Sequence, residues 1–285
     1  MGLRFGVLGP LRVWRDGQEI DLGTAKQRTL LAVLLMEPNR TVSLDRLTTA
    51  LWDDRPPKSA VFNLRTYAGK LRTALNDSGR PSPARIAGRH PGYALRVDPH
   101  ELDSAQFTEH FRNGKAAMSR GRPKEAVVHL SAGLALWRGR PAEDVPSTLA
   151  MAPWLDSLDE QHCTALETIA AARLSLGEHE VIVPELRDLL AVHPTRERLW
   201  AHLMLALYQG GDIAAALNAY ASAREMLRAL GIDPGPELVD LHRAMLNRDP
   251  ALAPAPRRDT VAVRYRRAPA RHGDVGRVRR PGPRR

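Results

Sequence analysis

The chain has 285 residues, of which 43% are hydrophobic, so it is long enough for roughly two domains with packed cores. No apolar run approaches the ~20 residues of a membrane span, and the first ten residues lack the plan of a signal peptide. The one cysteine, Cys163, excludes an internal disulfide and suits a reducing compartment. We therefore expect a cytoplasmic protein that does not enter a membrane.

The net charge of +10 is unevenly distributed along the chain. Residues 1–100 hold 16 Lys and Arg against 9 Asp and Glu, whereas residues 101–250 hold 15 against 21 and residues 251–285 hold 11 against 2. A basic first segment, an acidic middle and a basic end indicate segments with different partners. The first segment is the candidate for binding a polyanion such as nucleic acid.

The first 57 residues predict a small antiparallel sheet followed by two helices. Apolar residues alternate on both sides of an Asp-Gly turn signal within residues 3–22. A helix should begin at Thr24, where Gln27 completes a capping box, and end before Pro38. Ser43 can cap a second helix, and the prolines at 56–57 force a break before the next one.

The stretch 58–75 predicts an amphipathic helix that carries the functional surface. Apolar residues recur at three-then-four spacing and form one stripe: Val61, Leu64, Ala68, Leu71 and Leu75. Roughly opposite that stripe lie polar residues and one aromatic: Ser59, Phe62, Asn63, Thr66, Lys70 and Thr73. Such a helix suits a DNA major groove, with base-edge readers in the middle and phosphate contacts at its flanks. An ordinary surface helix with a solvated basic face shows the same pattern.

Residues 85–97 predict a basic hairpin after this helix, because Tyr93 and the apolar residues that follow it alternate beyond a Gly/Pro-rich turn. Strands, three helices and a final hairpin together describe a winged helix–turn–helix, in which the third helix reads the groove and the hairpin is the wing. Arg85, Arg89 and His90 are expected near the tip of the wing. A phosphate contact and a solvated loop are the two interpretations of these residues.

The second half of the chain predicts helical repeats of the tetratricopeptide type. Gly177 and Gly211 are 34 residues apart, which is the period of such repeats, and each would form the turn between two helices. A further unit is expected around Gly121, separated from the other two by a long connection at 138–162. A last helix at 236–246 should cover the apolar end of the stack.

The final residues, 250–285, are rich in Pro, Arg and Gly and poor in large apolar residues, which predicts a disordered basic tail. The sequence holds no GxxxxGK, HExxH or CxxC motif, and no group of His, Cys and carboxylate residues with metal-ligand spacing. We therefore expect no catalytic, cofactor-binding or metal-binding residues and no enzymatic activity.

Two sets of motifs resemble one protein family. Four stretches are similar to the OmpR-like winged helix of the Streptomyces antibiotic regulatory protein (SARP) family: FGVLGPLRVWRDG, GTAKQRTLLAVLLMEPNRTVSLDRLTTALWDDRPPKSA, YAGKLRTAL and GYAL. Two further stretches resemble the bacterial transcriptional activation domain that follows in this family: LWRGRP and HPTRERLWAHLMLALYQGGDIAAALNAYASAREMLRALGIDPGPEL. The resemblance implies a winged helix at 1–100, tetratricopeptide-like repeats at 101–249 and a tail at 250–285, as in small family members.

The resemblance also implies a function. It predicts a transcriptional activator, often specific for an antibiotic or other secondary-metabolite gene cluster, that binds direct repeats of double-stranded DNA near the promoter −35 region and recruits RNA polymerase holoenzyme. Such repeats imply self-association on DNA between head-to-tail neighbours rather than a symmetric dimer. YAGKLRTAL corresponds to the recognition helix, in which Gly69 replaces a usually larger residue. A mid-helix glycine costs about 0.5–1 kcal/mol relative to alanine, unless it permits a close backbone approach.

The sequence thus predicts sequence-specific DNA binding by the first segment and partner contact by the repeats. The residues expected at base edges are Asn63, Thr66 and Lys70. The residues expected at phosphates are Lys58, Arg65, Arg72, Arg85, Arg89 and His90. The alternative is a helical-repeat scaffold whose basic first segment is incidental. A two-component response regulator is disfavoured, because no receiver domain precedes the winged helix in this sequence.

Replacing Lys70 with alanine should weaken DNA binding. If Lys70 contacts only phosphate, the slope of log K against log salt falls by about 1. If it instead reads a guanine, preference at one base pair relaxes at a cost of about 1–3 kcal/mol. Titrations of a promoter duplex at several salt concentrations distinguish these outcomes, and an unchanged affinity and slope would remove Lys70 from the interface.

Overall fold

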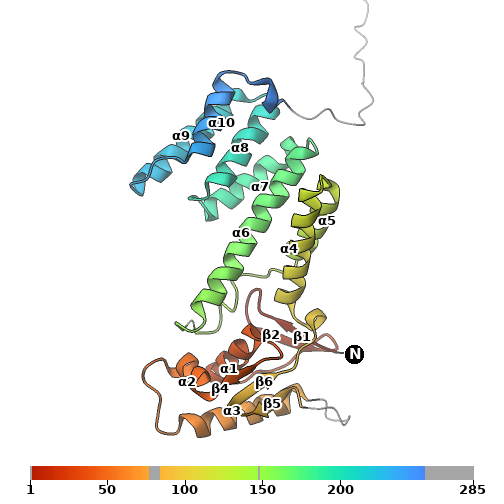
Figure 1. The fold of residues 1–285 in the computed structure, drawn as a ribbon, viewed down its shortest axis with the longest axis vertical. Helices are drawn as coiled ribbons and strands as arrows, with labels where there is room; N and C mark the ends of the chain where they lie inside the picture. The colour runs from red at the N-terminus through yellow and green to blue at the C-terminus, as the bar shows by residue number, and fades with distance from the viewer. Residues whose placement is uncertain (1, 77–83, 147, 254–285) are drawn as a thin grey trace, which may run out of the picture. The chain divides into compact units, whose positions relative to one another are not determined.

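The computed structural model describes residues 2–76, 84–146 and 148–253, and these described residues belong to one compact unit. Figure 1 draws the first strands and helices in red and orange and the later helices in yellow to blue. Among the described residues, no helix combines the length and the apolarity that crossing a membrane requires. The fold class predicted from the sequence is confirmed, because a winged helix–turn–helix with two small sheets precedes an all-α region.

The first sheet has three antiparallel strands in sequence order: β1 (Leu3–Gly6), β2 (Arg12–Arg15) and β3 (Gln18–Glu19). Phe5 pairs with Val13, and both side chains are buried. Asp16 and Gly17 both have positive φ, at 51° and 88°, which is the conformation that a tight two-residue hairpin turn requires. The alternating pattern and the Asp-Gly turn therefore predicted this sheet correctly.

The three helices of the winged helix follow: α1 (Ala25–Met36), α2 (Leu44–Trp52) and α3 (Ala60–Leu75). At the start of α1, the side chain of Gln27 accepts a hydrogen bond from the backbone N–H of Thr24 at 3.2 Å. At the start of α2, Ser43 Oγ accepts from Arg46 N at 3.2 Å. Both predicted caps are confirmed, and they satisfy backbone donors that the helices leave unpaired.

The second sheet contains the wing and has the order β4 (Thr41–Ser43), β6 (Gly92–Leu95) and β5 (Ile86–Arg89). The hairpin of β5 and β6 was predicted, but β4 was not, because three residues are too few to show an alternating pattern. Gly92 lies against β4 so closely that a Cβ atom there would come within 1.8 Å of Val42 O. The wing therefore needs glycine at position 92.

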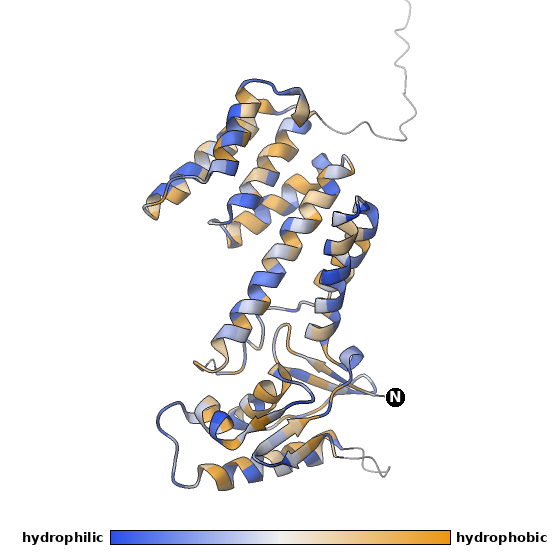
Figure 2. Cartoon of the chain, in the orientation of Figure 1, coloured by the Kyte–Doolittle hydropathy of each residue, from blue (hydrophilic) through white to orange (hydrophobic). Residues whose placement is uncertain are grey.

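The all-α region contains seven helices among the described residues: α4 (Asp103–Ser119), α5 (Pro123–Leu134), α6 (Ala152–Ser175), α7 (His179–Val192), α8 (Glu197–Gln209), α9 (Ile213–Ala229) and α10 (Pro236–Leu246). The turns at Gly121, Gly177 and Gly211 have positive φ of 68°, 76° and 89°, which glycine adopts without strain. The predicted repeat turns and the last helix are confirmed. Figure 2 shows orange apolar and blue polar residues alternating along these helices, as amphipathic packing requires.

Two predictions about the connections are wrong. The connection expected at 138–162 ends earlier, because α6 begins at Ala152; Pro153 occupies its first turn, where a proline starts a helix rather than breaking it. The tail expected to be disordered from 250 begins with a 3-10 helix at Pro250–Leu252, and Leu252 O accepts a hydrogen bond from Gln209 Nε2 at 3.3 Å. The rest of that predicted tail, 254–285, lies outside the described residues.

The loop between β1 and β2 is bound by polar groups of the all-α region. The carboxylate of Asp103, at the start of α4, accepts hydrogen bonds from Val7 N at 2.9 Å and from Leu8 N at 3.1 Å. Arg138 N in turn donates to Leu8 O at 2.7 Å. Because these backbone groups are buried, each bond satisfies a donor or acceptor that would otherwise be costly.

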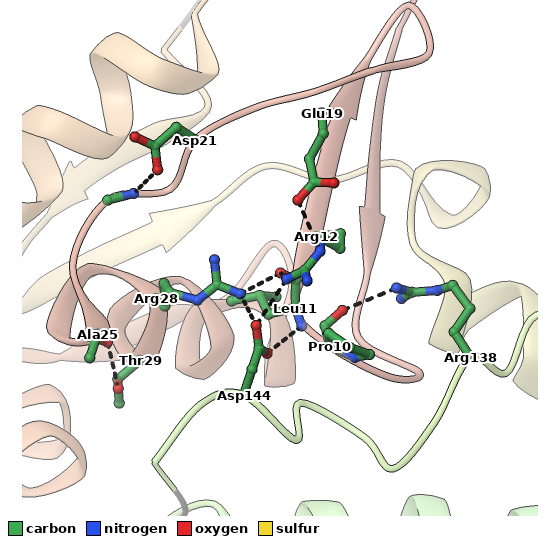
Figure 3. A network of polar contacts seen from close by, with 11 residues as sticks. Pro10, Leu11, Arg12, Glu19, Asp21, Ala25, Arg28, Thr29, Arg138 and Asp144 are labelled. Carbon is green, nitrogen blue, oxygen red and sulfur yellow. Dashed lines mark hydrogen bonds and ion pairs between the residues drawn. The ribbon is translucent and has the colours of Figure 1, made fainter.

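A second carboxylate, Asp144, binds the other end of the same loop. Figure 3 shows Asp144 between Arg12, Arg28 and the backbone of Leu11. Leu11 N donates to Asp144 at 2.6 Å, Arg12 Nη1 donates at 2.9 Å, and Arg28 forms an ion pair with the same carboxylate. Burial opposes ionisation of Asp144, but these three partners outweigh it and hold the pKa of Asp144 below its usual value.

Asp144→Asn should lower the free energy of unfolding by about 1–3 kcal/mol near neutral pH, toward the low end because the Asp144 side chain is 30% exposed. The lowered pKa means that this stabilisation is present above about pH 4 and is lost as the pH falls through the folded-state pKa. Urea unfolding at pH 7 and pH 3 measures both effects. Asp240→Asn, which removes an exposed pair with Arg243, is the control and should change little. A difference that does not shrink between pH 7 and pH 3 would contradict the role of the ionised carboxylate.

Candidate nucleic-acid interface

The third helix, α3, buries one stripe and presents the opposite side to solvent. The buried residues are at most 6% exposed: Ala60, Leu64, Ala68, Leu71 and Leu75. Val61, which the sequence placed in this stripe, is 43% exposed. That prediction is wrong because the helix begins at Ala60, whose methyl group takes the buried position, and Val61 lies roughly 60° from the centre of the stripe.

The outward side of α3 carries the predicted base readers. Thr66 and Lys70 are exposed, and Asn63 is half-buried. Asn63 Nδ2 donates to Ser59 Oγ at 3.3 Å, and Thr66 Oγ1 donates to Phe62 O at 3.1 Å. Both bonds are made within the helix and near solvent, so both side chains can exchange them for bonds to a base edge. The sequence of α3 contains no carboxylate, so its outward side repels no phosphate.

The flanks of α3 carry two further cations in exposed positions. Lys58 lies in the turn ahead of the helix, and Arg65 lies on the side of its second turn. At the other end, Arg15 of β2 donates to Ala74 O at 2.8 Å and to Asn76 O at 3.2 Å. A cation bound to the last carbonyls satisfies unpaired acceptors and stabilises the C-terminal end of the helix.

Arg72 connects α3 to the wing. Its Nε donates to Ile86 O at 2.7 Å, and its guanidinium lies 5.4 Å from the ring centroid of Tyr93. The side chain thus reaches both strands of the hairpin, β5 and β6. The predicted contact between Arg72 and phosphate is untested and stays a prediction, whereas its position assigns it a role in holding the wing beside α3.

Arg85 lies at the base of the wing rather than near its tip, so the expected location of this residue is wrong. Its guanidinium donates to both carboxylate oxygens of Glu101, at 2.7 Å and 2.8 Å. Glu101 is 6% exposed and also accepts from Asp98 N at 3.0 Å. Glu101 is not among the residues predicted from the sequence, although Asp98 and Glu101 have the spacing of a capping box.

Arg89 and His90 do lie at the turn of the hairpin, and both are exposed. The structure therefore divides the nine predicted DNA-contacting residues into two groups. Seven lie on α3, before it, or at the tip of the wing with side chains open to solvent or half-buried: Lys58, Asn63, Arg65, Thr66, Lys70, Arg89 and His90. Arg72 is engaged by Ile86 of the wing, and Arg85 is engaged by Glu101, just ahead of α4.

The described residues also contain a cysteine–histidine pair, which is the arrangement most like a catalytic site. Cys163 Sγ lies 3.8 Å from both ring nitrogens of His193. Burial raises the pKa of the Cys163 thiol and lowers the pKa of His193. A thiol held in its protonated form is a poor nucleophile, so this pair is best explained by packing. Among the described residues, no group of three or more His, Cys, Asp or Glu side chains could hold a metal ion.

Comparison with known proteins finds matches to both halves of the chain. Residues 17–95 match the family described as Transcriptional regulatory protein, C terminal, and residues 102–246 match the Bacterial transcriptional activator domain. Regulatory protein DnrI of Streptomyces peucetius is 32% identical over 256 residues, which cover 88% of this chain and 94% of DnrI. The chain belongs to the Streptomyces antibiotic regulatory protein family.

Two further relatives in this family are longer than the matched region. Regulatory protein AfsR of Streptomyces coelicolor is 41% identical over 253 residues, which cover 88% of this chain but 25% of AfsR. The solved structure of Mycobacterium tuberculosis EmbR in complex with a low-affinity phosphopeptide is 36% identical and gives a TM-score of 0.83. The matched region covers 87% of this chain and 66% of the EmbR chain. The family resemblance inferred from the motifs is confirmed, and the chain spans a quarter of the length of AfsR.

Arg85→Ala should lower the free energy of unfolding by about 2–4 kcal/mol, because it leaves the Glu101 carboxylate buried without its cation. Arg89→Ala, at the exposed tip of the same hairpin, should change it by less than about 0.5 kcal/mol. Chemical denaturation followed by tryptophan fluorescence measures both. Equal and small effects would show that the ion pair at the base of the wing does not stabilise it.

Proposed function

We propose that this chain is a non-enzymatic transcriptional activator that binds double-stranded DNA sequence-specifically through α3. The observation that carries the proposal is the division of α3 into two sides. Its apolar stripe is buried, and its outward side offers an amide, hydroxyls and cations with no carboxylate. A helix held in this way can enter a major groove, contact base edges with its middle residues and contact phosphates with its flanks.

Within this proposal, the side chains divide by task. Asn63, Thr66 and Lys70 contact base edges, because they lie on the outward side of the helix. Contacts to phosphate come from exposed cations and the histidine at the flanks and the wing: Lys58, Arg65, Arg89 and His90. Arg72 and Arg85 contribute mainly by fixing the wing, which follows from their bonds to Ile86 O and Glu101.

The proposed operator consists of direct repeats near the promoter −35 region. Direct repeats relate successive copies by translation along the DNA, so neighbouring copies would meet head to tail rather than across a two-fold axis. The proposed target genes belong to a biosynthetic cluster for an antibiotic or another secondary metabolite. Membership of the family supports this assignment.

The proposed partner of the helical repeats is RNA polymerase holoenzyme. A groove of about 570 Å³ lies between α7, α8 and α9, with Leu190, Trp200 and Met226 in its lining. An apolar groove on stacked helix pairs is the surface that such repeats use for protein partners. Footprinting of promoter DNA with and without polymerase tests whether the bound protein recruits it.

The same groove favours a second candidate, in which the chain is a protein-binding scaffold and its basic winged helix is incidental. Gel shifts separate the two functions. A scaffold would bind DNA only weakly, with strong salt dependence and no sequence preference. The proposed activator should prefer one duplex over the nonspecific background by about 10³-fold or more.

The combined change of Asn63, Thr66 and Lys70 to alanine should abolish preferential binding to promoter DNA. Alanine has high helix propensity, so α3 should remain folded while it loses its base contacts. DNase I footprinting of promoters next to the protein's own gene measures occupancy, and circular dichroism verifies the fold.

A matched control replaces an exposed asparagine, threonine and lysine of the all-α region: Asn247, Thr195 and Lys124. This variant should occupy the promoter as the unmodified protein does. Promoter occupancy that survives the triple change in α3 would overturn the assignment of this helix to DNA reading.

A further inference from the structure

The outermost line of α3 is formed by residues that are short or uncharged. Phe62, Thr66, Gly69 and Thr73 follow one another at intervals of four, three and four residues, which places them along one ridge of the helix. This ridge is centred opposite the buried stripe. Exposed Arg65 and Lys70 lie on either side of it rather than along it. The long cations therefore flank the ridge, and the side chains nearest to a bound ligand are an aromatic ring and two threonines.

Phe62 is the most exposed large hydrophobic residue of this helix. Its side chain is 69% exposed, whereas the apolar residues of the stripe are nearly inaccessible. Isolated apolar residues on a surface are common, but this one occupies the first turn of the helix proposed to read DNA, beside Asn63 and Thr66. In a major groove, the apolar feature of a base pair is the C5-methyl group of thymine, which phenylalanine and threonine methyl groups contact.

Packing within the described residues does not require glycine at position 69. Gly69 lies inside α3 with helical backbone, and a Cβ atom placed there would meet nothing within 4 Å beyond its chain neighbours and the nearby backbone of its own helix. Glycine inside a helix lowers stability relative to alanine, so the chain forgoes stability at this position without gaining an internal contact. A glycine on the outward ridge does allow an external surface to approach the helix backbone.

We propose that Phe62 is a specificity-determining residue that contacts a thymine methyl group in the operator, while Gly69 lets α3 lie close to the floor of the major groove. This inference rests on the proposed function. DNA is the occupant that the charges favour, because Arg65 and Lys70 flank the ridge, Arg89 and His90 lie at the exposed tip of the wing, and α3 carries no carboxylate. In DNA, the negatively charged phosphates lie on both sides of the groove that contains the thymine methyl group. The cations flanking the ridge and the apolar ring on the ridge match that arrangement.

The test of Phe62 begins with the unmodified protein, which selects its preferred duplex from a pool of randomised duplexes. Each thymine of that duplex is then replaced in turn by deoxyuridine, which removes only the C5-methyl group. For the unmodified protein, replacement at one thymine should weaken binding about fourfold, as the loss of one buried methyl group predicts. Phe62→Ala should weaken binding to the original duplex by at least that factor and should no longer distinguish thymine from deoxyuridine there.

The outcomes separate this inference from the function on which it rests. If the unmodified protein enriches no sequence, the proposed function fails. If it enriches one, but Phe62→Ala keeps the same sensitivity to every deoxyuridine, the role of Phe62 is overturned. Val128→Ala, which removes another exposed apolar side chain on α5, is the matched control and should leave affinity and thymine preference unchanged.

The role of Gly69 is tested by a variant that should gain stability and lose affinity. Gly69→Ala should raise Tm by about 1–4 °C, because alanine favours the helix and its methyl group has free space. The same variant should bind the selected duplex at least about threefold more weakly, and Gly69→Leu more weakly still. A Gly69→Ala variant that is more stable and binds equally well would overturn the close approach.

Discussion

Burial of one stripe of α3 is the constraint on which the DNA-binding surface depends. Leu64, Ala68 and Leu71 are inaccessible to solvent in the core of the winged helix, so the rotation of α3 about its own axis is fixed. Burial of each large side chain is worth about 1.5–3 kcal/mol, far more than the local bonds that Asn63 and Thr66 make on the outward side. The apolar side of the helix therefore decides which polar groups face a ligand.

The wing and the N-terminal strands are positioned by a different kind of contact. Arg72, Arg85 and Glu101 connect the hairpin to α3 and to the start of the all-α region, and Asp103 and Asp144 bind backbone groups of the β1–β2 loop. These are charged groups that accept or donate several hydrogen bonds each while partly or fully buried. Removing one partner leaves the other unsatisfied, so such contacts specify geometry more strongly than exposed ion pairs do.

Local chemistry explains why much of the fold was predictable. The cap at Ser43, the turn at Asp16 and Gly17 and the glycines between helix pairs each depend on a few neighbouring residues, and all were identified from the sequence. The misses depend on distant residues or short elements. Asp103 and Asp144 bind backbone groups 96 and 133 positions away, and β4 becomes a strand only because β6 pairs with it.

The candidate site shows the same division. Periodicity correctly placed Lys70 and Thr66 on the outward side of α3 and Leu64 inside, because a helix repeats regularly. It placed Val61 incorrectly, because the end of a helical stripe depends on where the helix begins. Composition alone could not show that the guanidinium of Arg85 is held by Glu101. The sequence therefore offered no reason to separate Arg85 from the exposed basic residues at the tip of the wing.

The contacts of residues 101–144 have a consequence for hybrid regulators assembled from two family members. A junction at residue 100 coincides with the boundary that the sequence suggests, yet it would place Glu101, Asp103 and Asp144 in one parent and their partners in the other. The winged helix of one parent would then contact side chains of the other parent at its β1–β2 loop and at the base of its wing. Transplanting this module with its specificity intact therefore means transferring those three acidic residues together with it.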